Sequence, residues 1–555
     1  MKATLGAAAS LLSFLLSLLR WFAIALLCVS ALAQADPRAA MTAHVPAAVS
    51  SGLAPLIGHV PASERLSLAI SLPPRNQAEL EDLLQQIYDR ESPNFHKYLS
   101  VSEFTERFGP SEADHAAVLA FTRKHGLEVI DIPVNRMVVD VEGFASDIES
   151  AFHISLGVYQ HPSESRTFYA PDREPTLDLD VRLLHISGLD DFSVARPKFE
   201  DFALHSNPAK TSGSGPGGSY LGSDLRAAYY GSGSLNGAGQ SVAIFSLKGY
   251  ELSDVQLYFS SIHQTLNVPI IGVSVNGASL NCPPASCNDG EQSLDMEQAI
   301  SMAPGLSSLR FYVGRNNVSV FNQMAADNIS KSISCSWGWA DNESSLDPIF
   351  EEMGAQGQSV FVATGDNGSG TPADVVWPAD DPYVTAVGGS VLITNGPGGT
   401  WKGETGWDQS AGGPSPNKVP IPSYQLIPGV ITASNGASST LRNIPDVSSE
   451  SNASQYNCSN GRCAEHGGGT SYAAPLWAGL IAMVNQQAAS NGEANVGFFN
   501  PALYDIGVGS TFTTDFHDIT SGSNGGYTAG VGYDLVTGWG SPQGVNLINA
   551  LAPLE

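Results

Sequence analysis

Hydrophobic and polar residues alternate with two different periods between residues 36 and 200. Some stretches repeat apolar side chains every three or four residues, as one face of a helix does. They are Gln77–Tyr88, Ser100–Phe108, Glu112–His125 and Ala145–Phe152. Shorter runs have the composition of strands, namely Leu66–Leu72, Leu127–Ile132, Met137–Val141 and Val181–Ile186. This mixture predicts a compact α/β unit over residues 36–200.

The pattern changes from Tyr220 onward, where short, almost wholly apolar runs recur between helical stretches. These runs are Val242–Phe245, Leu309–Val313, Ser332–Trp337, Val360–Ala363 and Val384–Val387. Strands separated by helices predict a doubly wound parallel sheet over residues 220–555, with functional groups at the carboxyl ends of its strands. Residues 201–219 between the two units are polar and rich in Gly and Ser, so we expect an exposed linker that is easily cut.

The N-terminus has the layout of a secretory signal at residues 1–35. Lys2 and Arg20 precede the apolar run Trp21–Leu32, and Ala33-Gln34-Ala35 offers a small-residue cleavage pattern. The apolar residues 11–19 upstream leave an uncleaved anchor as the alternative, although Arg20 interrupts that span. The rest of the chain has no apolar segment long enough to cross a membrane.

Charge and cysteine content narrow the possible partners. The formal net charge is −28, which disfavours binding to nucleic acid or to anionic membranes and suits an acidic medium. Export permits disulfides. Cys282 and Cys287 enclose one tight loop and Cys458 and Cys463 another, although spacing alone does not prove pairing. Cys335 lies in an alternating strand-like run and is expected to be a buried free thiol.

The segment from Gly468 to Pro475 delivers a serine to the start of an apolar stretch. Residues Ala473–Ala488 predict a buried helix with Pro475 in its first turn, where proline is tolerated. Ser471 would then lie beside unpaired backbone N–H groups at the positive end of the helix dipole, which stabilise a developing anion. It is a candidate nucleophile; a simple N-cap is the alternative.

A nucleophilic serine needs a base, and a carboxylate is the better candidate here. After the linker the histidines are His263, His466 and His517, and none lies in a turn typical of a Ser-His-Asp triad. Glu291 and Asp295 lie one turn apart in a helical segment that ends near Met302. Two close carboxyls share a proton, so one can act as a general base in acid. An acidic first helical turn is the competing interpretation.

Asp366 follows the strand Val360–Ala363 in a glycine-rich loop. This is the edge at which a parallel sheet presents functional groups. A protonated Asp366 could donate a hydrogen bond to an oxyanion, which an ionised carboxylate cannot do. The alternative is that Asp366 only forms the turn.

These motifs together resemble those of the sedolisins, or serine-carboxyl peptidases. The resemblance is carried by Glu291…Asp295, Asp366, Gly469-Thr470-Ser471…Pro475, Ser336-Trp337-Gly338 and the region from Trp377 to Gly389. It implies a subtilisin-like fold with Ser471 as nucleophile, Glu291 as general base and Asp295 as its partner. It also implies that Asp366 stabilises the oxyanion and that Trp337 lies in the substrate cleft. One departure is the stretch Ile244–Leu247, which lacks a glutamate that extends the carboxylate chain in some relatives.

Two C-terminal loops are candidates for a metal site. Asp518 lies in Phe516–Gly522 and Asp534 follows the glycine-rich stretch Gly530–Gly532. Carboxylates and exposed carbonyls suit calcium, although a hairpin with Asp/Gly turns would have the same composition. The family resemblance implies one Ca²⁺ bound by Asp518, Asp534 and the carbonyls of Ile519, Gly530 and Gly532.

Residues 36–200 resemble the activation domain of the same proenzymes. The likeness is carried by Ser92–Leu99 and by Phe104–Ser111. It implies an intramolecular inhibitor that is removed by cleavage in the linker. The sequence therefore predicts a secreted, monomeric endopeptidase that cuts proteins or peptides in acid. A tripeptidyl aminopeptidase of the same family and a catalytically silent exported binding protein are the alternatives.

Overall fold

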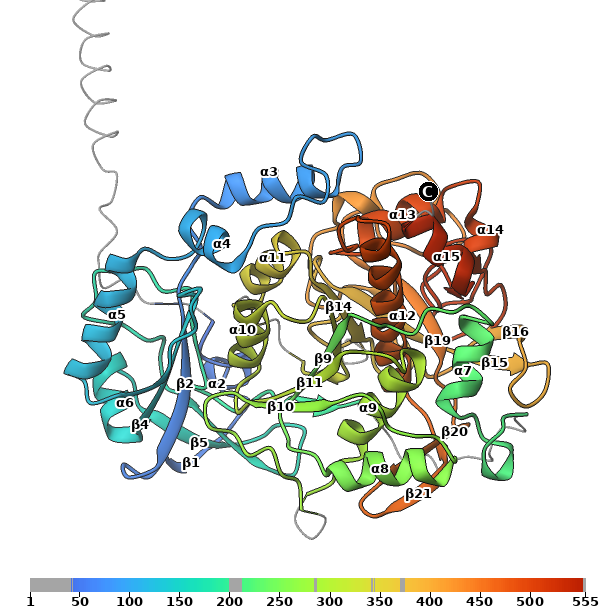
Figure 1. Ribbon diagram of the computed structural model, residues 1–555. Helices are drawn as coiled ribbons and strands as arrows, with labels where there is room; N and C mark the ends of the chain where they lie inside the picture. The colour runs from blue at the N-terminus through green and yellow to red at the C-terminus, as the bar shows by residue number, and fades with distance from the viewer. Residues whose placement is uncertain are drawn as a thin grey trace, which may run out of the picture.

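The computed structural model describes residues 41, 43–198, 212–283, 287–340, 343, 345–369 and 375–552. An N-terminal unit, blue to cyan, packs beside a larger C-terminal unit that runs from green to red (Figure 1). The predicted signal at residues 1–35 and residues 201–211 of the predicted linker lie outside the described residues. Within the described ranges, no helix combines the length and apolar character needed to span a membrane.

Two antiparallel sheets and several helices form the N-terminal unit. One sheet has the order β3-β4-β2-β7 and the other β1-β5-β6. The strands are β1 (Leu56–His59), β2 (Arg65–Ser71), β3 (Glu128–Asp131), β4 (Val138–Phe144), β5 (Leu156–Gln160), β6 (Thr167–Pro171) and β7 (His185–Ser187). The helices include α3 (Gln77–Tyr88), α4 (Val101–Arg107), α5 (Glu112–Lys124) and α6 (Ala145–Phe152). Their buried side chains, such as Leu68, Phe121 and Val139, share one core.

Most elements predicted for this unit are present, and α3 and α6 have the predicted bounds. The strand expected at Val181–Ile186 is wrong in position, because β7 covers only His185–Ser187. Val181 and Leu183 instead pack against the core from irregular chain, so their apolar character reflects burial rather than strand pairing.

The C-terminal unit is built on one central sheet with the order β10-β11-β9-β12-β14-β15-β16, and β19 also pairs with β15. The strands are β9 (Ser241–Ser246), β10 (Ile270–Ser274), β11 (Ser308–Val313), β12 (Ser332–Cys335), β14 (Ser359–Ala363), β15 (Thr385–Thr394), β16 (Trp401–Gly406) and β19 (Val447–Glu450). All these pairings are parallel except that of β16 with β15. The parallel sheet predicted from the apolar runs is therefore confirmed.

Both faces of this sheet are buried. In β9, Val242 and Ile244 point into one core, while Ala243 and Phe245 point into another. The helices α9 (Gly290–Met302) and α12 (Thr470–Ser490) supply the first core, and α10 (Asn317–Asp327) and α11 (Asp347–Ala355) supply the second. Burial on both sides explains why these strands read as continuous apolar runs.

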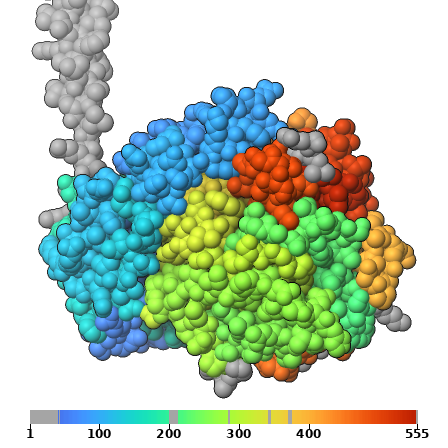
Figure 2. All heavy atoms as spheres, in the orientation of Figure 1, coloured from blue at the N-terminus to red at the C-terminus, as the bar shows by residue number. Residues whose placement is uncertain are grey.

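The second core continues into the N-terminal unit. Leu80 and Leu84 of α3 and Phe104 of α4 belong to the same buried cluster as the side chains of α10 and α11. Figure 1 shows α3 and α4 beside α11 and α10, and Figure 2 shows the blue N-terminal surface in continuous contact with the yellow and red surfaces. Polar contacts also join the two units, since Tyr98 Oη donates to the carbonyl oxygens of Asn495 at 2.9 Å and Val496 at 2.8 Å. The N-terminal unit is thus docked through a shared hydrophobic core.

The described part of the predicted linker is not a free chain. Ser214 donates from its backbone N–H and its hydroxyl to the carboxylate of Asp224, at 2.8 and 2.6 Å. Gly213 and Ser219 are buried. The exposure expected for the linker is therefore wrong at Gly213, whose N–H is bonded to the Gly218 carbonyl at 2.8 Å, whereas Ser214, Pro216 and Gly217 are exposed as predicted.

The cysteines behave as the sequence suggested. Cys282 is bonded to Cys287, and Cys458 to Cys463. The second pair joins β20 (Gln455–Ser459) to β21 (Arg462–Gly467). Cys335 on β12 is a buried free thiol, as predicted.

Candidate active site

Ser471 lies in the first turn of α12 and is fully buried. The helix begins at Thr470, earlier than the apolar stretch suggested, because Asp366 accepts the Thr470 N–H and so holds the first turn. Pro475 consequently lies inside the helix, not in its first turn as predicted. Proline has no N–H, so it cannot bond the Ser471 carbonyl. The hydroxyl of Ser336 lies 3.4 Å from that carbonyl oxygen instead.

The serine hydroxyl faces a carboxylate. Ser471 Oγ donates a hydrogen bond to Glu291 Oε2 at 3.0 Å, although the two residues are far apart in the chain. Glu291 lies in the first turn of α9 and is 3% exposed. A serine bonded to a group that can take its proton is the arrangement that nucleophilic catalysis needs. His466 lies instead on β21 and His517 on β22 (Phe516–His517).

Asp295 lies one turn after Glu291 on α9 and is also buried. Its Oδ1 accepts a hydrogen bond of 2.6 Å from Ser336 Oγ, which extends from the end of β12. Burial raises the pKa of Asp295 well above its usual range, while the Ser336 hydroxyl opposes that rise. Burial therefore favours the protonated form of Asp295, one turn after the candidate base on α9.

Asp366 lies in the loop after β14, at the carboxyl edge of the sheet. Its Oδ1 accepts hydrogen bonds of 2.8 Å from both the backbone N–H and the hydroxyl of Thr470. The Gly365 N–H donates to the same hydroxyl at 3.1 Å. The other oxygen, Oδ2, faces Gly469, where an added Cβ would lie only 2.6 Å from it. Gly469 has a φ of +129°, so glycine suits the position for both reasons.

Trp337 begins the short strand β13 (Trp337–Gly338) and is buried. The partner of this strand is β8 (Arg196–Pro197), the last strand before the linker. The pairing is antiparallel, and the Lys198 N–H then donates to the Ser336 carbonyl at 2.9 Å. The N-terminal unit thus fills the position expected for substrate. Sequence reasoning missed this contact, and its local signal is the Arg-Pro-Lys stretch ahead of the linker.

Lys198 lies among the candidate catalytic groups. Its carbonyl oxygen would be 3.1 Å from a Cβ added to Gly469. Burial lowers the pKa of its ammonium group, whereas the charges of Asp366 and Glu291 oppose that change. The candidate site residues therefore lie together, and Lys198 lies beside them. They are Ser471, Glu291, Asp295, Asp366 and Trp337.

The two loops predicted to bind calcium also meet. The Gly532 N–H donates to Asp518 Oδ1 at 3.1 Å, and the Gly530 N–H donates to Asp534 Oδ2 at 3.0 Å. Asp534 is 1% exposed, and burial raises its pKa to about 6. Burial also raises the pKa of Asp518. Ile519, the remaining predicted ligand, follows Asp518 directly and is buried.

Side chains alone would not complete this metal site. Among the described residues, no three His, Cys, Asp or Glu side chains are grouped closely enough to hold an ion. Backbone carbonyls would have to supply the remaining oxygens. The buried Asp534 and the half-buried Asp518, beside the glycine-rich segment Gly530–Gly532, nevertheless supply the carboxylate oxygens that Ca²⁺ prefers.

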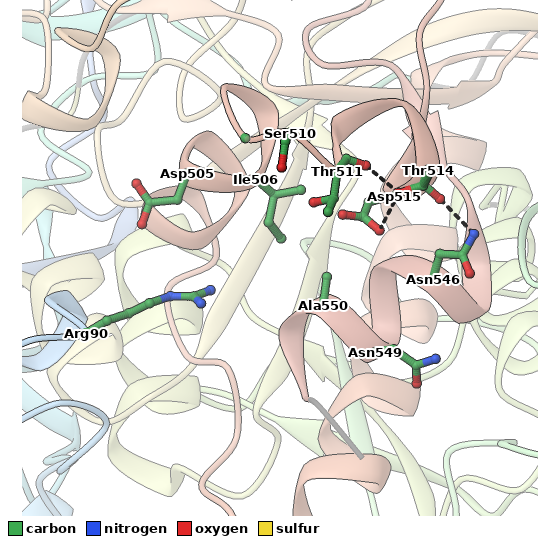
Figure 3. Close-up of a pocket in the computed structure, with 11 residues that line it drawn as sticks. Arg90, Asp505, Ile506, Ser510, Thr511, Thr514, Asp515, Asn546, Asn549 and Ala550 are labelled. Carbon is green, nitrogen blue, oxygen red and sulfur yellow. Dashed lines mark hydrogen bonds between the residues drawn. The ribbon is translucent and has the colours of Figure 1, made fainter. Parts of the chain in front are cut away.

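A separate cavity of about 750 Å³ lies away from these groups, between α13 (Asn500–Gly507), α14 (Phe512–Asp515) and α15 (Gly544–Leu551). Figure 3 shows Arg90 of the N-terminal unit at one side of it and Asn546 and Asn549 at the other. Its lining contains none of the candidate catalytic residues. The cavity is therefore not the candidate active site, whose cleft is filled by residues 196–198.

Comparisons with known proteins show which chains this one is similar to. Residues 55–192 match the family model described as the pro-kumamolisin activation domain. The chain is 31% identical over 535 residues to kumamolisin of Bacillus sp. (strain MN-32), covering 89% of this chain and 93% of that protein. It is 29% identical over 553 residues to sedolisin of Pseudomonas sp. (strain 101), with coverages of 92% and 90%.

More distant relatives include tripeptidyl-peptidase 1 of Rattus norvegicus, which is 25% identical over 560 residues, with coverages of 89% and 93%. Among solved structures, Pseudomonas sedolisin, a serine-carboxyl proteinase complexed with two molecules of pseudo-iodotyrostatin, aligns with a TM-score of 0.51 and 28% identity. That alignment covers 60% of this chain and 97% of the sedolisin chain, and it supports the subtilisin-like fold. This chain, a serine peptidase with a proenzyme domain, therefore belongs to the sedolisin family of serine-carboxyl peptidases.

Proposed function

We propose that the protein is an exported endopeptidase that cuts proteins in acid through Ser471, Glu291, Asp295 and Asp366. The observation that carries this proposal is the 3.0 Å hydrogen bond from Ser471 Oγ to Glu291 Oε2 in a buried site. Export is supported by the signal-like N-terminal sequence and by the two disulfides.

The mechanism is acyl transfer. Ser471 Oγ attacks the scissile carbonyl while Glu291 takes the hydroxyl proton. The oxyanion that forms is held by a protonated Asp366 and by backbone N–H groups in the first turn of α12. Glu291 returns the proton to the leaving amine, and water then hydrolyses the ester to free Ser471.

A carboxylate general base is suited to catalysis at acidic pH. An unperturbed histidine has a pKa of about 6.5 and is protonated well below it, whereas an ordinary glutamate has a pKa of about 4.3. Asp295 keeps its proton because burial raises its pKa. The pair then carries one proton and one negative charge, and Glu291 can hold that charge as the base.

One observation favours internal cleavage over removal of tripeptides. The chain that occupies the cleft continues upstream of β8, and Ser193 Oγ accepts a hydrogen bond of 3.1 Å from the Ala340 N–H. This contact, five residues before Lys198, supports a non-primed side that is open to a longer chain. A tripeptidyl aminopeptidase would need a barrier there that binds a free N-terminus.

Calcium is proposed as a structural ion held by Asp518, Asp534 and the carbonyls of Ile519, Gly530 and Gly532. When bound, it would neutralise the buried Asp534 and the half-buried Asp518 and fix the loops around β22. The catalytic steps do not pass through it. The N-terminal unit is proposed to inhibit the enzyme in cis, because residues 196–198 occupy the substrate position.

The test uses purified full-length precursor incubated with denatured casein from pH 3 to pH 7. Wild type should convert to a shorter form and release internal peptides, most rapidly in acid. Ser471→Ala should remain intact and inactive, whereas the matched change Ser490→Ala at the exposed end of α12 should behave as wild type. A Ser471→Ala protein that still digests casein would refute the proposal. Release of tripeptides alone, abolished by N-terminal acetylation of the substrate, would establish the tripeptidyl alternative.

A further inference from the structure

We infer that Ser336 is a positioning residue of the proposed peptidase, because its hydroxyl holds the Asp295 carboxyl beside Glu291 while its backbone carbonyl binds the main chain in the cleft. The inference rests on the proposed function and names a further residue of the same site. Ser336 follows β12 directly and is fully buried. It therefore lies at the carboxyl edge of the central sheet, where parallel sheets present functional groups.

The side chain of Ser336 makes one short hydrogen bond. Its Oγ donates to Asp295 Oδ1 at 2.6 Å, and Asp295 is 1% exposed. A serine hydroxyl has a single hydrogen to donate, so the contact of 3.4 Å with the Ser471 carbonyl oxygen is secondary. Away from water such a bond is electrostatically stronger than in solution. The Asp295 carboxyl is thus held through one of its two oxygens.

This bond determines which oxygen of Asp295 carries the proton of the acid. Oδ1 accepts from Ser336, so the proton is left to Oδ2, which is buried and has no hydrogen-bond partner among the described residues. Glu291 lies one turn earlier on α9, and its Oε2 accepts the Ser471 hydroxyl at 3.0 Å. Rotation of the Asp295 carboxyl would exchange its two oxygens, and the Ser336 hydroxyl opposes that exchange.

The backbone of Ser336 has a different partner. Its carbonyl oxygen accepts the N–H of Lys198 at 2.9 Å, where the N-terminal unit lies along β13 as an added strand. A substrate that adds a strand in the same way would place its own N–H there. Ser336 thus contacts the acid pair through its side chain and the bound chain through its backbone. Removing the side chain alone separates these two contacts.

The other titratable groups near Asp295 do not replace this hydroxyl. They are Glu291 on α9, the Cys335 thiol on β12 and, in the precursor, Lys198. Burial raises the pKa of the Cys335 thiol, so the thiol stays neutral. The strand β9, which packs against α9, ends in the neutral Ser246, whose hydroxyl donates to the Lys248 carbonyl at 2.8 Å.

The experiment measures kcat and KM of mature wild type and serine variants on a quenched fluorescent peptide chosen from a casein digest. Ser336→Ala should lower kcat about 10- to 100-fold and leave KM within about threefold, since only the backbone contact remains. Ser336→Thr keeps a hydroxyl and should recover most of kcat. Ser334→Ala is the matched control, because Ser334 is buried on the same strand and its Oγ has no partner among the described residues.

A pH profile separates positioning from a purely structural role. It is measured in the Asp366→Asn background, so that the remaining alkaline decline of kcat reports the Glu291–Asp295 pair. A hydrogen bond to an ionised carboxyl lowers its pKa, and the Ser336 hydroxyl acts on Asp295 in this direction. Ser336→Ala should therefore raise the pKa of Asp295 and move the alkaline decline to higher pH by about one unit.

Melting curves establish that each variant is folded. A folded Ser336→Ala enzyme with the kcat of wild type would overturn the inference. An equal loss of kcat in Ser334→Ala, or a loss in Ser336→Ala with an unmoved pH profile, would also overturn it, because the effect would then be structural. If Ser471→Ala is inactive in each of these cases, the proposed peptidase function stands. A Ser471→Ala protein that digests casein would instead refute the proposed function.

Discussion

Thr470 fixes Asp366 by two hydrogen bonds, from its backbone N–H and its hydroxyl to the same oxygen, Oδ1, each at 2.8 Å. The aspartate is thereby tied to the residue that precedes the nucleophile. Oδ1 thus serves as the acceptor for Thr470, while Oδ2 faces Gly469. The different hydrogen-bonding roles of Oδ1 and Oδ2 determine how an amide at position 366 would affect activity.

Asp366→Asn should therefore preserve part of the activity and change its pH dependence. The amide oxygen can still accept from Thr470, while the amide N–H takes the place of Oδ2 as the donor to the oxyanion. An aspartate donates only when protonated, so wild-type activity should fall as pH rises through its pKa, whereas the amide donates at every pH.

The measurement is kcat/KM against pH for wild type and Asp366→Asn, each scaled to its own maximum. The variant should lose part of the decline on the alkaline side. If the two scaled profiles coincide, the decline belongs to the Glu291–Asp295 pair and not to Asp366.

Glu291→Gln should reduce kcat by at least about 10²-fold, since general-base catalysis contributes about 10²–10⁴-fold. The amide keeps the size of the side chain but cannot accept the Ser471 proton. Glu297→Gln is the matched control, because Glu297 is buried on the same helix and accepts from the Cys458 N–H at 3.2 Å, away from Ser471. Near-normal turnover by folded Glu291→Gln would remove Glu291 from the role of base.

The candidate residues could be picked out from the sequence because each lies in a local motif at a strand or helix end. Asp366 follows β14, and Ser471 lies in the first turn of α12, just ahead of the apolar run that predicted this helix. What could not be predicted depends on contacts between distant residues. The start of α12 is set by Asp366, and the pairing of Arg196 with Gly338 joins the two units.

Strands with polar sequences escaped prediction for a related reason. β19 reads Val-Ser-Ser-Glu and carries no apolar pattern, yet it is buried beside β15. Its Glu450 carboxylate accepts from Ser454 Oγ at 2.7 Å and from the Asn452 N–H at 3.0 Å. Such partners become visible only once the fold has brought them together, because hydropathy does not record them.

Buried carboxyls with raised pKa values should favour the folded precursor in acid. Burial raises the pKa of Glu352 on α11 to about 8, although Asn135 of the N-terminal unit donates to it at 2.8 Å. An unfolded glutamate has a pKa of about 4.3. The stability that this group contributes is complete below that value and is lost as pH rises through about 8, at about 1.4 kcal/mol per pH unit.

Glu352→Gln, made in the Ser471→Ala background to prevent self-cleavage, should therefore flatten the fall of melting temperature between pH 4 and pH 8. The amide resembles the protonated acid and does not titrate. Glu106→Gln, at an exposed position of α4, serves as the control and should leave the slope unchanged. A slope identical in all three proteins would show that Glu352 does not bind a proton on folding.

Calcium removal should destabilise the mature enzyme before it affects chemistry, because Asp518 and Asp534 lie in C-terminal loops away from Ser471. An ion that binds only the folded state stabilises it by about 2.7 kcal/mol at 100 times its Kd, so the melting temperature should rise with the free calcium concentration. Acid should weaken the effect, since the carboxylates must be ionised to coordinate the ion.

Asp534→Ala should lower the melting temperature and abolish its dependence on calcium. The loss of dependence is the informative result, because the variant also loses the hydrogen bonds from Val536 N–H at 2.8 Å and Thr537 N–H at 2.9 Å. Asp505→Ala, at an exposed position of α13, should retain the dependence. If chelation leaves the wild-type melting curve unmoved at both neutral and acidic pH, and elemental analysis finds no metal, the loops around Asp518 and Asp534 are ordinary turns.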